Sequence, residues 1–350
     1  MRFLPRFLRR DRPRLRADGR LRSELWLDRD DAHRRIDKRL RRGTLDGARA
    51  EKLRQLVEHG HLRFTLDLDE AQTAAIDGAA DALWRDRPAD VAYACRGLPI
   101  PFAYGDGADR RPPYRIADLH TACDAALRLA LDPTLFEWVE LIFGAPAVAV
   151  RSFYFEWGSQ ELLHRDPMRV PVSRPHHLLT AWIALEDVTA ESGPVTYIPG
   201  SHRWPFYQLT PSRMLVHRPH ASPSAAWDAA QWQRVGVEPE VFTARRGEVL
   251  LWHHGLLHGG ARPRDPERSR KSLVVHFSTR ATMRRLRLRY QLPAADGTLS
   301  TAELTSDRLL ELDGRCAFDS PLRVHGLPAA AQEPAPALLS RPALQHATML

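Results

Sequence analysis

The chain has 350 residues, of which 43% are hydrophobic and 27% charged, with a formal net charge of +8. This length suits two average domains or one large β-rich domain with helical additions, and no apolar run reaches the roughly 18 residues that a transmembrane helix needs. Nucleic-acid binding is disfavoured despite the positive charge, because acidic residues alternate with the arginines and only residues 2–22 are dominated by one sign.

The N-terminal part carries mostly helical patterns. Residues 1–43 are rich in arginine and poor in apolar anchors, so we predict a partly ordered segment with a short helix over 30–42. From Thr44, apolar residues recur at helical spacing, and Gly60 stands where a helix end is expected.

A short strand and two further helices are expected before the pattern changes. The strand covers 61–66 and the next helix 69–84. Asp132 can cap free amide groups and Pro133 fits a first turn, so a helix begins there and ends at Gly144.

After Pro146 the chain shows short runs of β-branched and aromatic residues, each bounded by Gly, Pro, Asp or Ser. A series of this kind predicts a β-sandwich or barrel-like core. The expected strands cover 148–155, 178–185, 194–198, 247–252 and 273–278.

We therefore expect a mainly β domain with helical additions. The domain spans 44–323, after the N-terminal segment 1–43, and an Ala- and Pro-rich tail at 324–350 is expected to be loose. Within the domain we predict mainly helical support over 44–144, the β core over 145–285 and a C-terminal elaboration over 286–323.

The cysteines give no sign of an oxidising compartment. Cys95, Cys123 and Cys316 lie outside any Cys-x-x-Cys pattern, so neither a disulfide framework nor a thiolate zinc site is indicated. The basic first ten residues lack the continuous hydrophobic region of an export signal. We therefore expect a soluble, cytoplasmic protein.

Three residues have the chemistry of a metal site. In an extended segment His164 and Asp166 point to the same side, and His258 follows the apolar run 249–252 in a strand-turn-strand pattern. Two imidazoles and one carboxylate hold a non-haem ferrous ion and leave positions open for oxygen and a co-substrate. A His-x-Asp pattern alone is common, and the same three ligands with a water also suit zinc.

Arg270 stands twelve residues after His258, at the start of a predicted strand. A guanidinium pairs with a carboxylate through two parallel hydrogen bonds, so Arg270 is a candidate anchor for an anionic co-substrate. The alternative is a surface ion pair, the commoner fate of a single arginine.

The order of these motifs, together with 182–188 and 192–202, resembles the phytanoyl-CoA dioxygenase family of iron- and 2-oxoglutarate-dependent oxygenases. The resemblance covers roughly 148–280. It implies a double-stranded β-helix core of the jelly-roll, cupin-like type.

The resemblance also implies roles for individual residues. His164, Asp166 and His258 would be the iron ligands, Arg270 would bind the co-substrate 2-oxoglutarate, and Trp182 would lie along it. A strand tryptophan is as often simple core packing.

Two further interpretations concern the pocket. Strand alternation allows the Tyr154 hydroxyl to point into the barrel toward co-substrate or substrate, with core packing as the alternative. The arginines near the metal pair, Arg165, Arg169 and Arg174, favour a polar or anionic substrate.

The resemblance implies hydroxylation of an unactivated C–H bond of a small polar or carrier-linked metabolite by oxygen, with release of succinate and carbon dioxide. Asp166 is present where related halogenases have a small residue, so the hydroxylase ligand set is complete. The rival interpretations are a zinc-dependent hydrolase and a non-catalytic ligand-binding β-helix protein. Substrate identity and oligomeric state stay open.

Overall fold

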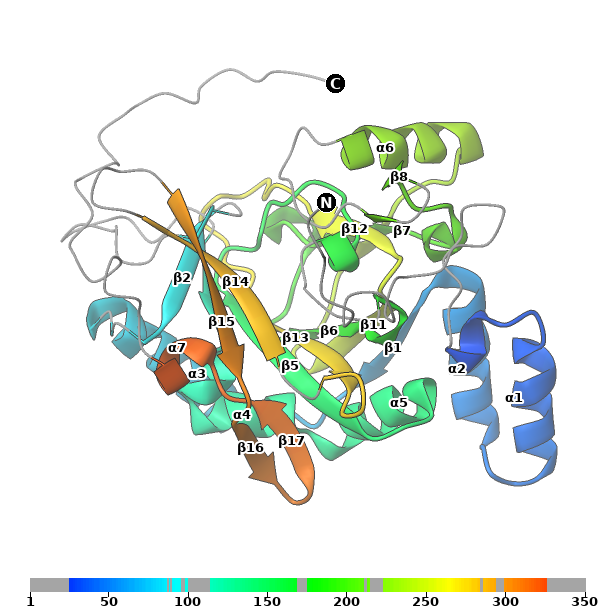
Figure 1. Ribbon diagram of the computed structural model, residues 1–350, viewed down its shortest axis with the longest axis horizontal. Coiled ribbons are helices and arrows are strands. Elements are labelled where there is room, and N and C mark those ends of the chain that lie inside the picture. Colours follow the sequence, from blue (N-terminus) through cyan, green and yellow to red (C-terminus); the bar gives the residue numbers. More distant parts are fainter. Residues whose placement is uncertain are drawn as a thin grey trace, which may run out of the picture.

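The computed structural model describes residues 25–325 except 87, 89, 96–97, 100–113, 169–174, 211–212, 215–222, 284–285 and 294–298. Residues 1–24 of the predicted arginine-rich segment and the predicted loose tail after 325 therefore lie outside the described residues. A large sheet forms the centre of the described part, with helices against it (Figure 1). None of these helices combines the length and apolar character that a membrane span requires.

The predicted N-terminal helices are confirmed, and their ends show the expected caps. The Asp132 carboxylate accepts a hydrogen bond from the backbone N–H of Leu135 at 3.1 Å, while Gly60 and Gly144 adopt left-handed φ angles of 82° and 65° where their helices end. The helices are α1 (Ala32–Arg41), α2 (Gly47–His59), α3 (Glu70–Asp86), α4 (Asp124–Ala130) and α5 (Pro133–Phe143), followed much later by α6 (Pro223–Val235) and α7 (Pro321–His325).

Ten strands of the described part form one large sheet, in the order β1-β11-β6-β13-β5-β4-β2-β3, with β17 running parallel to β5 and β16 pairing with β17. The central strands are antiparallel neighbours although they are far apart in the sequence. The bounds are β1 (His61–Thr65), β2 (Ala92–Cys95), β3 (Leu98–Pro99), β4 (Tyr114–Ala117), β5 (Ala147–Phe155), β6 (Leu179–Ala184), β11 (Glu248–His253), β13 (Ser272–Thr279), β16 (Leu309–Leu312) and β17 (Arg315–Phe318).

A small antiparallel sheet, β10-β7-β12, supplies the other wall of the jelly roll. The strands predicted after Pro146 are confirmed as β5, β6, β7, β11 and β13. The remaining strands are β7 (Val195–Ile198), β8 (Gln208–Thr210), β9 (Arg213–Met214), β10 (Glu240–Phe242), β12 (Leu257–Gly260), β14 (Leu286–Pro293) and β15 (Leu299–Ser306).

The region expected to be mainly helical support also extends the large sheet. All five residues of β1 pair with β11, from His61 opposite Trp252 to Thr65 opposite Glu248, and β4 pairs with β5. The sequence predicted β1 but not β2, β3 or β4, which have only two to four residues each and show too short a run for alternation to be recognised.

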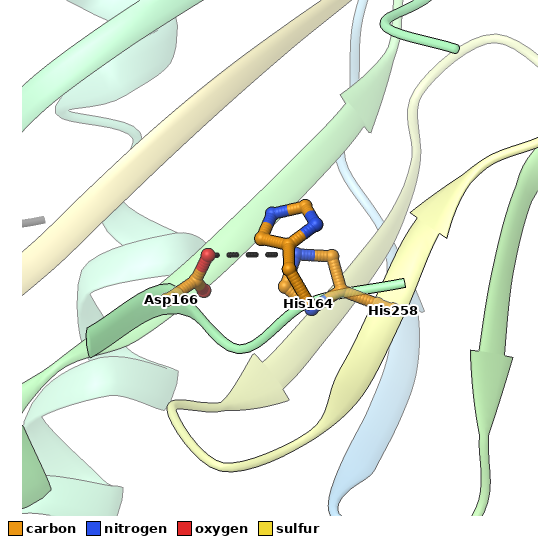
Figure 2. A group of neighbouring side chains, drawn as sticks. All are labelled: His164, Asp166 and His258. Carbon is orange, nitrogen blue, oxygen red and sulfur yellow. Dashed lines mark ion pairs between the residues drawn. The ribbon is translucent and has the colours of Figure 1, made fainter. Parts of the chain in front are cut away.

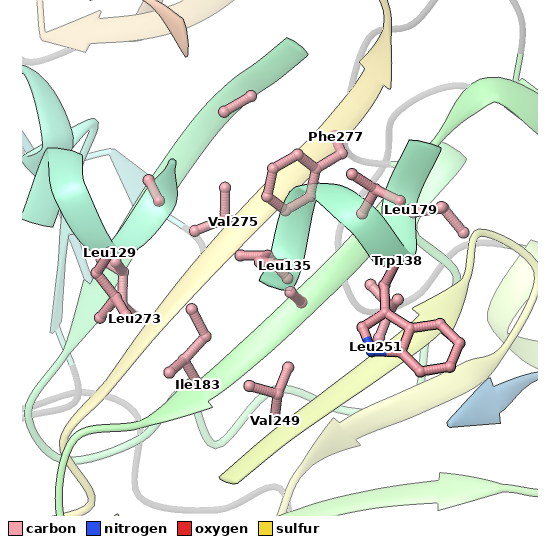
Figure 3. Close-up of a cluster of buried hydrophobic side chains, with 14 of the residues drawn as sticks. Leu129, Leu135, Trp138, Leu179, Ile183, Val249, Leu251, Leu273, Val275 and Phe277 are labelled. Carbon is pink, nitrogen blue, oxygen red and sulfur yellow. The ribbon is translucent and has the colours of Figure 1, made fainter. Parts of the chain in front are cut away.

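Apolar side chains cover both faces of the large sheet. On the outer face, Ile183, Leu251 and Val275 pack against Leu135 and Trp138 of α5 (Figure 3). This face holds most of the apolar core and joins the helices to the sheet.

The inner face is turned toward the small sheet. Trp182, Trp252 and Val274 lie in a second apolar cluster with Tyr197 and Phe242, which belong to β7 and β10. Residues that alternate along each strand therefore belong to two different environments.

Candidate metal centre and co-substrate site

The three predicted metal ligands come together between the two sheets (Figure 2). One ligand atom from each of His164, Asp166 and His258 lies within 4.8 Å of the other two. Oδ1 of Asp166 is 3.4 Å from Nε2 of His258, and both side chains are buried, whereas His164 is half-buried. The group thus has the donor atoms and the convergence that a two-histidine, one-carboxylate site requires.

A backbone bridge brings the ligand segment to the small sheet. The N–H of His164 donates to the carbonyl of His258 at 2.8 Å, and the N–H of His258 donates back at 3.0 Å. The approach is close, because a Cβ at Gly259 would lie 2.6 Å from the carbonyl oxygen of Glu161. Glycine at this position therefore lets the segment lie against β12.

The backbone also orients the two imidazoles. Nδ1 of His164 is 2.8 Å from the carbonyl oxygen of Leu162, and Nδ1 of His258 is 2.9 Å from that of Leu256. A carbonyl only accepts hydrogen bonds, so Nδ1 of each ring carries a proton. Nε2 is therefore the nitrogen of each ring that is left to bind a metal ion.

Two inner-face side chains hold the carboxylate of Asp166. Its Oδ2 accepts hydrogen bonds from Oγ1 of Thr180 at 2.5 Å and from Nε1 of Trp252 at 2.8 Å. Oδ1 is left facing His258. Burial alone would raise the pKa of Asp166, but His258 and His276 hold it well below its usual range, so the group is a carboxylate.

Thr180 and Trp252 were not predicted as site residues. Their neighbours on β6 and β11 face the outer core, so strand alternation would have placed both on the inner face. His276 was also missed: it is buried opposite Thr180 in the ladder, with Nε2 3.9 Å from Oδ1 of Asp166. No local pattern in the sequence connects any of these residues with position 166.

Arg270 is buried, with 2% of its surface exposed, and its guanidinium lies 5.5 Å from the ring centre of Trp182. Within the described part of the chain, no carboxylate is at ion-pair distance from it and its Nε has no hydrogen-bond partner. Burial lowers the pKa of Arg270 to about 10, so it remains charged at neutral pH. Buried charges are normally paired, so a buried cation with no partner among the described residues is a candidate site for an anion.

Gly158 makes room for that guanidinium. It has a φ of 75°, and a Cβ there would lie 2.7 Å from Nε of Arg270. The backbone N–H of Arg270 also donates to the carbonyl of Glu156 at 2.7 Å, which ties the arginine to the segment after β5. Substitution of Gly158 would therefore compete with the guanidinium for space.

Trp182 lies on the inner face of β6, two residues after Thr180 and therefore roughly 7 Å farther along the strand. Its indole Nε1 is buried and has no hydrogen-bond partner among the described residues. Trp182 thus lies between Thr180, which bonds to Asp166, and the guanidinium of Arg270.

The prediction that the Tyr154 hydroxyl points into the barrel is wrong. Tyr154 belongs to the outer core, and its hydroxyl donates to the carboxylate of Asp77 on α3 at 3.2 Å. Phe153 and Phe155, its neighbours on β5, face the inner cluster instead. Strand alternation correctly assigned Tyr154 and its neighbours to opposite faces of β5. Both faces carry apolar side chains, so the sequence did not show which face is turned toward the small sheet.

The interpretation of Arg165 as a substrate-binding residue is also wrong. Its side chain is 1% exposed and pairs with Asp228 of α6 at 2.9 Å. A guanidinium committed to a buried carboxylate is not available to a substrate. Arg169 and Arg174 lie outside the described residues.

Residues 103–272 match the family model described as phytanoyl-CoA dioxygenase (PhyH). These residues are just under half of the chain, and over this range the chain is similar to the phytanoyl-CoA dioxygenase family. The matched range includes all three candidate metal ligands and Arg270, so it contains the site just described.

Solved structures with the same fold accompany this match. The non-haem α-ketoglutarate-dependent carbocyclase SnoK from nogalamycin biosynthesis is 21% identical, with a TM-score of 0.51 over 68% of this chain and 85% of its own. EctD from S. alaskensis with bound Fe is 19% identical, with a TM-score of 0.51 over 77% and 84%. The same protein with 2-oxoglutarate and 5-hydroxyectoine is 18% identical, with a TM-score of 0.50 over 77% and 83%. At these identities the likeness concerns the fold, which is the predicted jelly roll.

Proposed function

We propose that this protein is an iron(II)- and 2-oxoglutarate-dependent dioxygenase that hydroxylates an unactivated C–H bond of a small metabolite. The observation that carries the proposal is a complete His164, Asp166 and His258 ligand set between the two sheets, together with a buried Arg270 that has no ion-pair partner among the described residues. The match of residues 103–272 to the phytanoyl-CoA dioxygenase family model and the likeness in fold to EctD, solved with Fe and with 2-oxoglutarate, support the same assignment.

The donor set fits ferrous iron. Three neighbouring ligands leave coordination positions open, and the two imidazole nitrogens and Oδ1 of Asp166 are already oriented by their hydrogen bonds. When bound, iron would supply the activation of oxygen that a protein side chain cannot provide.

The residues beyond the ligands fit 2-oxoglutarate. The forked guanidinium of Arg270 would receive the carboxylate farthest from the metal through two parallel hydrogen bonds, and Trp182 would lie beside the carbon chain. Phe155, whose ring centre is 5.9 Å from the guanidinium, helps to exclude water and so strengthens that ion pair.

The overall reaction balances with the co-substrate and oxygen alone. One oxygen atom enters the substrate C–H bond as a hydroxyl group, and the other enters succinate as 2-oxoglutarate loses carbon dioxide. The protein's own contribution is to hold the co-substrate, keep the metal ligands oriented and exclude water.

Arg270 separates this proposal from its rivals. A zinc hydrolase could use the same three ligands, but a buried arginine with no carboxylate partner in the described part of the chain would have no part in it. For a non-catalytic binding protein, nothing requires the three ligand atoms to remain within 4.8 Å of one another.

The test is an anaerobic titration of the apo-protein with ferrous iron and 2-oxoglutarate, followed through the weak visible charge-transfer band of the chelated complex. His164→Ala should abolish the band because it removes a ligand. Arg270→Ala should retain iron binding but require about 10- to 100-fold more 2-oxoglutarate, since charge-assisted hydrogen bonds are lost.

Arg268→Ala is the matched control. Arg268 is two residues away, 57% exposed and paired with Asp265 at the surface, so its removal should leave the titration unchanged. Well-folded wild-type protein that gives no band would contradict the proposal, and a band unaffected by Arg270→Ala would contradict the role of Arg270.

A further inference from the structure

The residue between the two paired ligands points away from the metal. His164 and Asp166 lie on one side of their segment, and Arg165 is directed to the opposite side, where it is 1% exposed. Whatever holds Arg165 therefore fixes the rotation of the segment about its own axis. That rotation decides whether both ligands face a common point.

Arg165 is held from three directions. Its Nη2 lies 2.9 Å from Oδ1 of Asp228, its Nη1 donates to the carbonyl of Trp204 at 3.2 Å, and its guanidinium carbon lies 4.4 Å from the ring centre of Phe206. Only a long, forked and planar cation satisfies all three contacts at once.

The partners of Arg165 are themselves joined. Nε1 of Trp227 on α6 donates to the carbonyl of Pro205 at 3.1 Å, and the rings of Tyr207 and Trp227 lie 6.0 Å apart. In Figure 1, α6 lies above β7 and β8, away from the helices of the outer core. Residues 204–207 and α6 therefore form a separate support on the far side of the ligand segment.

The ion pair between Arg165 and Asp228 is buried, with 1% of Arg165 and 7% of Asp228 exposed, so two charges are taken out of water. Buried ion pairs of this kind are commonly no more stable than apolar side chains of the same size, whereas removal of one partner is strongly unfavourable. Their distinctive effect is to favour one arrangement of the chain over others.

We propose that Arg165 is a positioning residue for the metal centre. Its ion pair with Asp228 fastens the ligand segment to α6 and so holds His164 and Asp166 toward His258 before the metal arrives. The inference rests on the proposed function only in requiring a metal at these ligands. Loss of the ion pair should therefore lower metal affinity in the apo-protein, with no substrate or turnover involved.

The test is a titration of full-length apo-protein with Co(II), followed by its visible absorption bands, which report both affinity and ligand geometry. His164→Ala defines the background from other sites. Asp228→Asn and Arg165→Gln should each weaken Co(II) binding about tenfold or more, the range typical of residues that orient metal ligands. Because the two side chains act through one contact, the double variant should be no weaker than the worse single variant.

Asp319→Asn is the matched control. Asp319 is buried and paired with Arg308 at 3.3 Å, outside the ligand segments, so the same substitution should lower the melting temperature but leave Co(II) affinity within twofold. If Asp228→Asn does not fold, Arg165→Lys keeps the charge but not the fork, and should weaken Co(II) binding while the protein stays folded.

The outcomes separate the two proposals. Wild-type protein that binds no Co(II) above the His164→Ala background would overturn both. Wild-type binding together with unchanged affinity and absorption bands in the folded Asp228→Asn or Arg165→Lys variants would overturn only the positioning role, because the ion pair would then be purely structural.

Discussion

The outer and inner faces of the large sheet are built from the same strands, yet their polar groups differ. On the outer face Tyr154 is bonded to Asp77, and Oγ of Ser152 lies 2.7 Å from Nδ1 of His120. On the inner face, Nε1 of Trp182 and Nδ1 of His276 are buried and have no hydrogen-bond partner among the described residues.

This difference indicates that the outer face contributes mainly to stability and the inner face mainly to binding. Buried polar groups are nearly always hydrogen-bonded in a folded protein, so the outer face, where they are bonded, has the character of an ordinary protein core. A concentration of unpartnered polar atoms around three convergent metal ligands indicates a surface shaped to receive other molecules. Substitutions on the two faces should therefore affect different measurements.

The largest effect on stability is expected on the outer face. Phe277→Ala removes a fully buried ring that lies 5.6 Å from that of Phe136 on α5, and should lower the free energy of unfolding by about 3–5 kcal/mol. Denaturant unfolding measures this change. Co(II) affinity, measured below the melting temperature, should stay within twofold of wild type; a large loss would mean that the two faces are not independent.

An inner-face change of similar size should act on the metal instead. Thr180→Val keeps the shape of the side chain but removes the donor to Oδ2 of Asp166, and should weaken Co(II) binding about tenfold or more. Thr279→Val is the control, because Thr279 is equally buried on β13 and donates to Thr282 rather than to a ligand. Equal metal affinity in both variants would show that Thr180 does not orient the carboxylate.

The smallest effect is expected for Tyr154→Phe. The change removes one hydrogen bond to Asp77 and should lower the free energy of unfolding by about 1 kcal/mol. Because Tyr154 faces the helices, the affinity for 2-oxoglutarate, measured by the iron titration, should not change. A clear loss of that affinity would restore the sequence-based interpretation of Tyr154 as a co-substrate residue.

The sequence predicted a large part of the fold, and it did so where the physical cause is local. Asp132 and Gly144 delimit α5 because a side chain near in sequence caps the first turn and a left-handed residue ends the last. Short β-branched runs predicted the core strands for a similar reason. The strands β2, β3 and β4, with two to four residues each, show too short a run to be recognised. The helix α6 and the longer strands β14 and β15 were not predicted either.

For the candidate site, the sequence by itself determined which donor groups are present and in what order: two imidazoles, a carboxylate and a guanidinium. Only the tertiary structure decided what surrounds them. It placed Tyr154 outside and Arg165 against Asp228, and it brought Thr180 and Trp252 to the carboxylate of Asp166. Strand alternation defines two faces, but which face is inside depends on how distant strands pair and what packs against them.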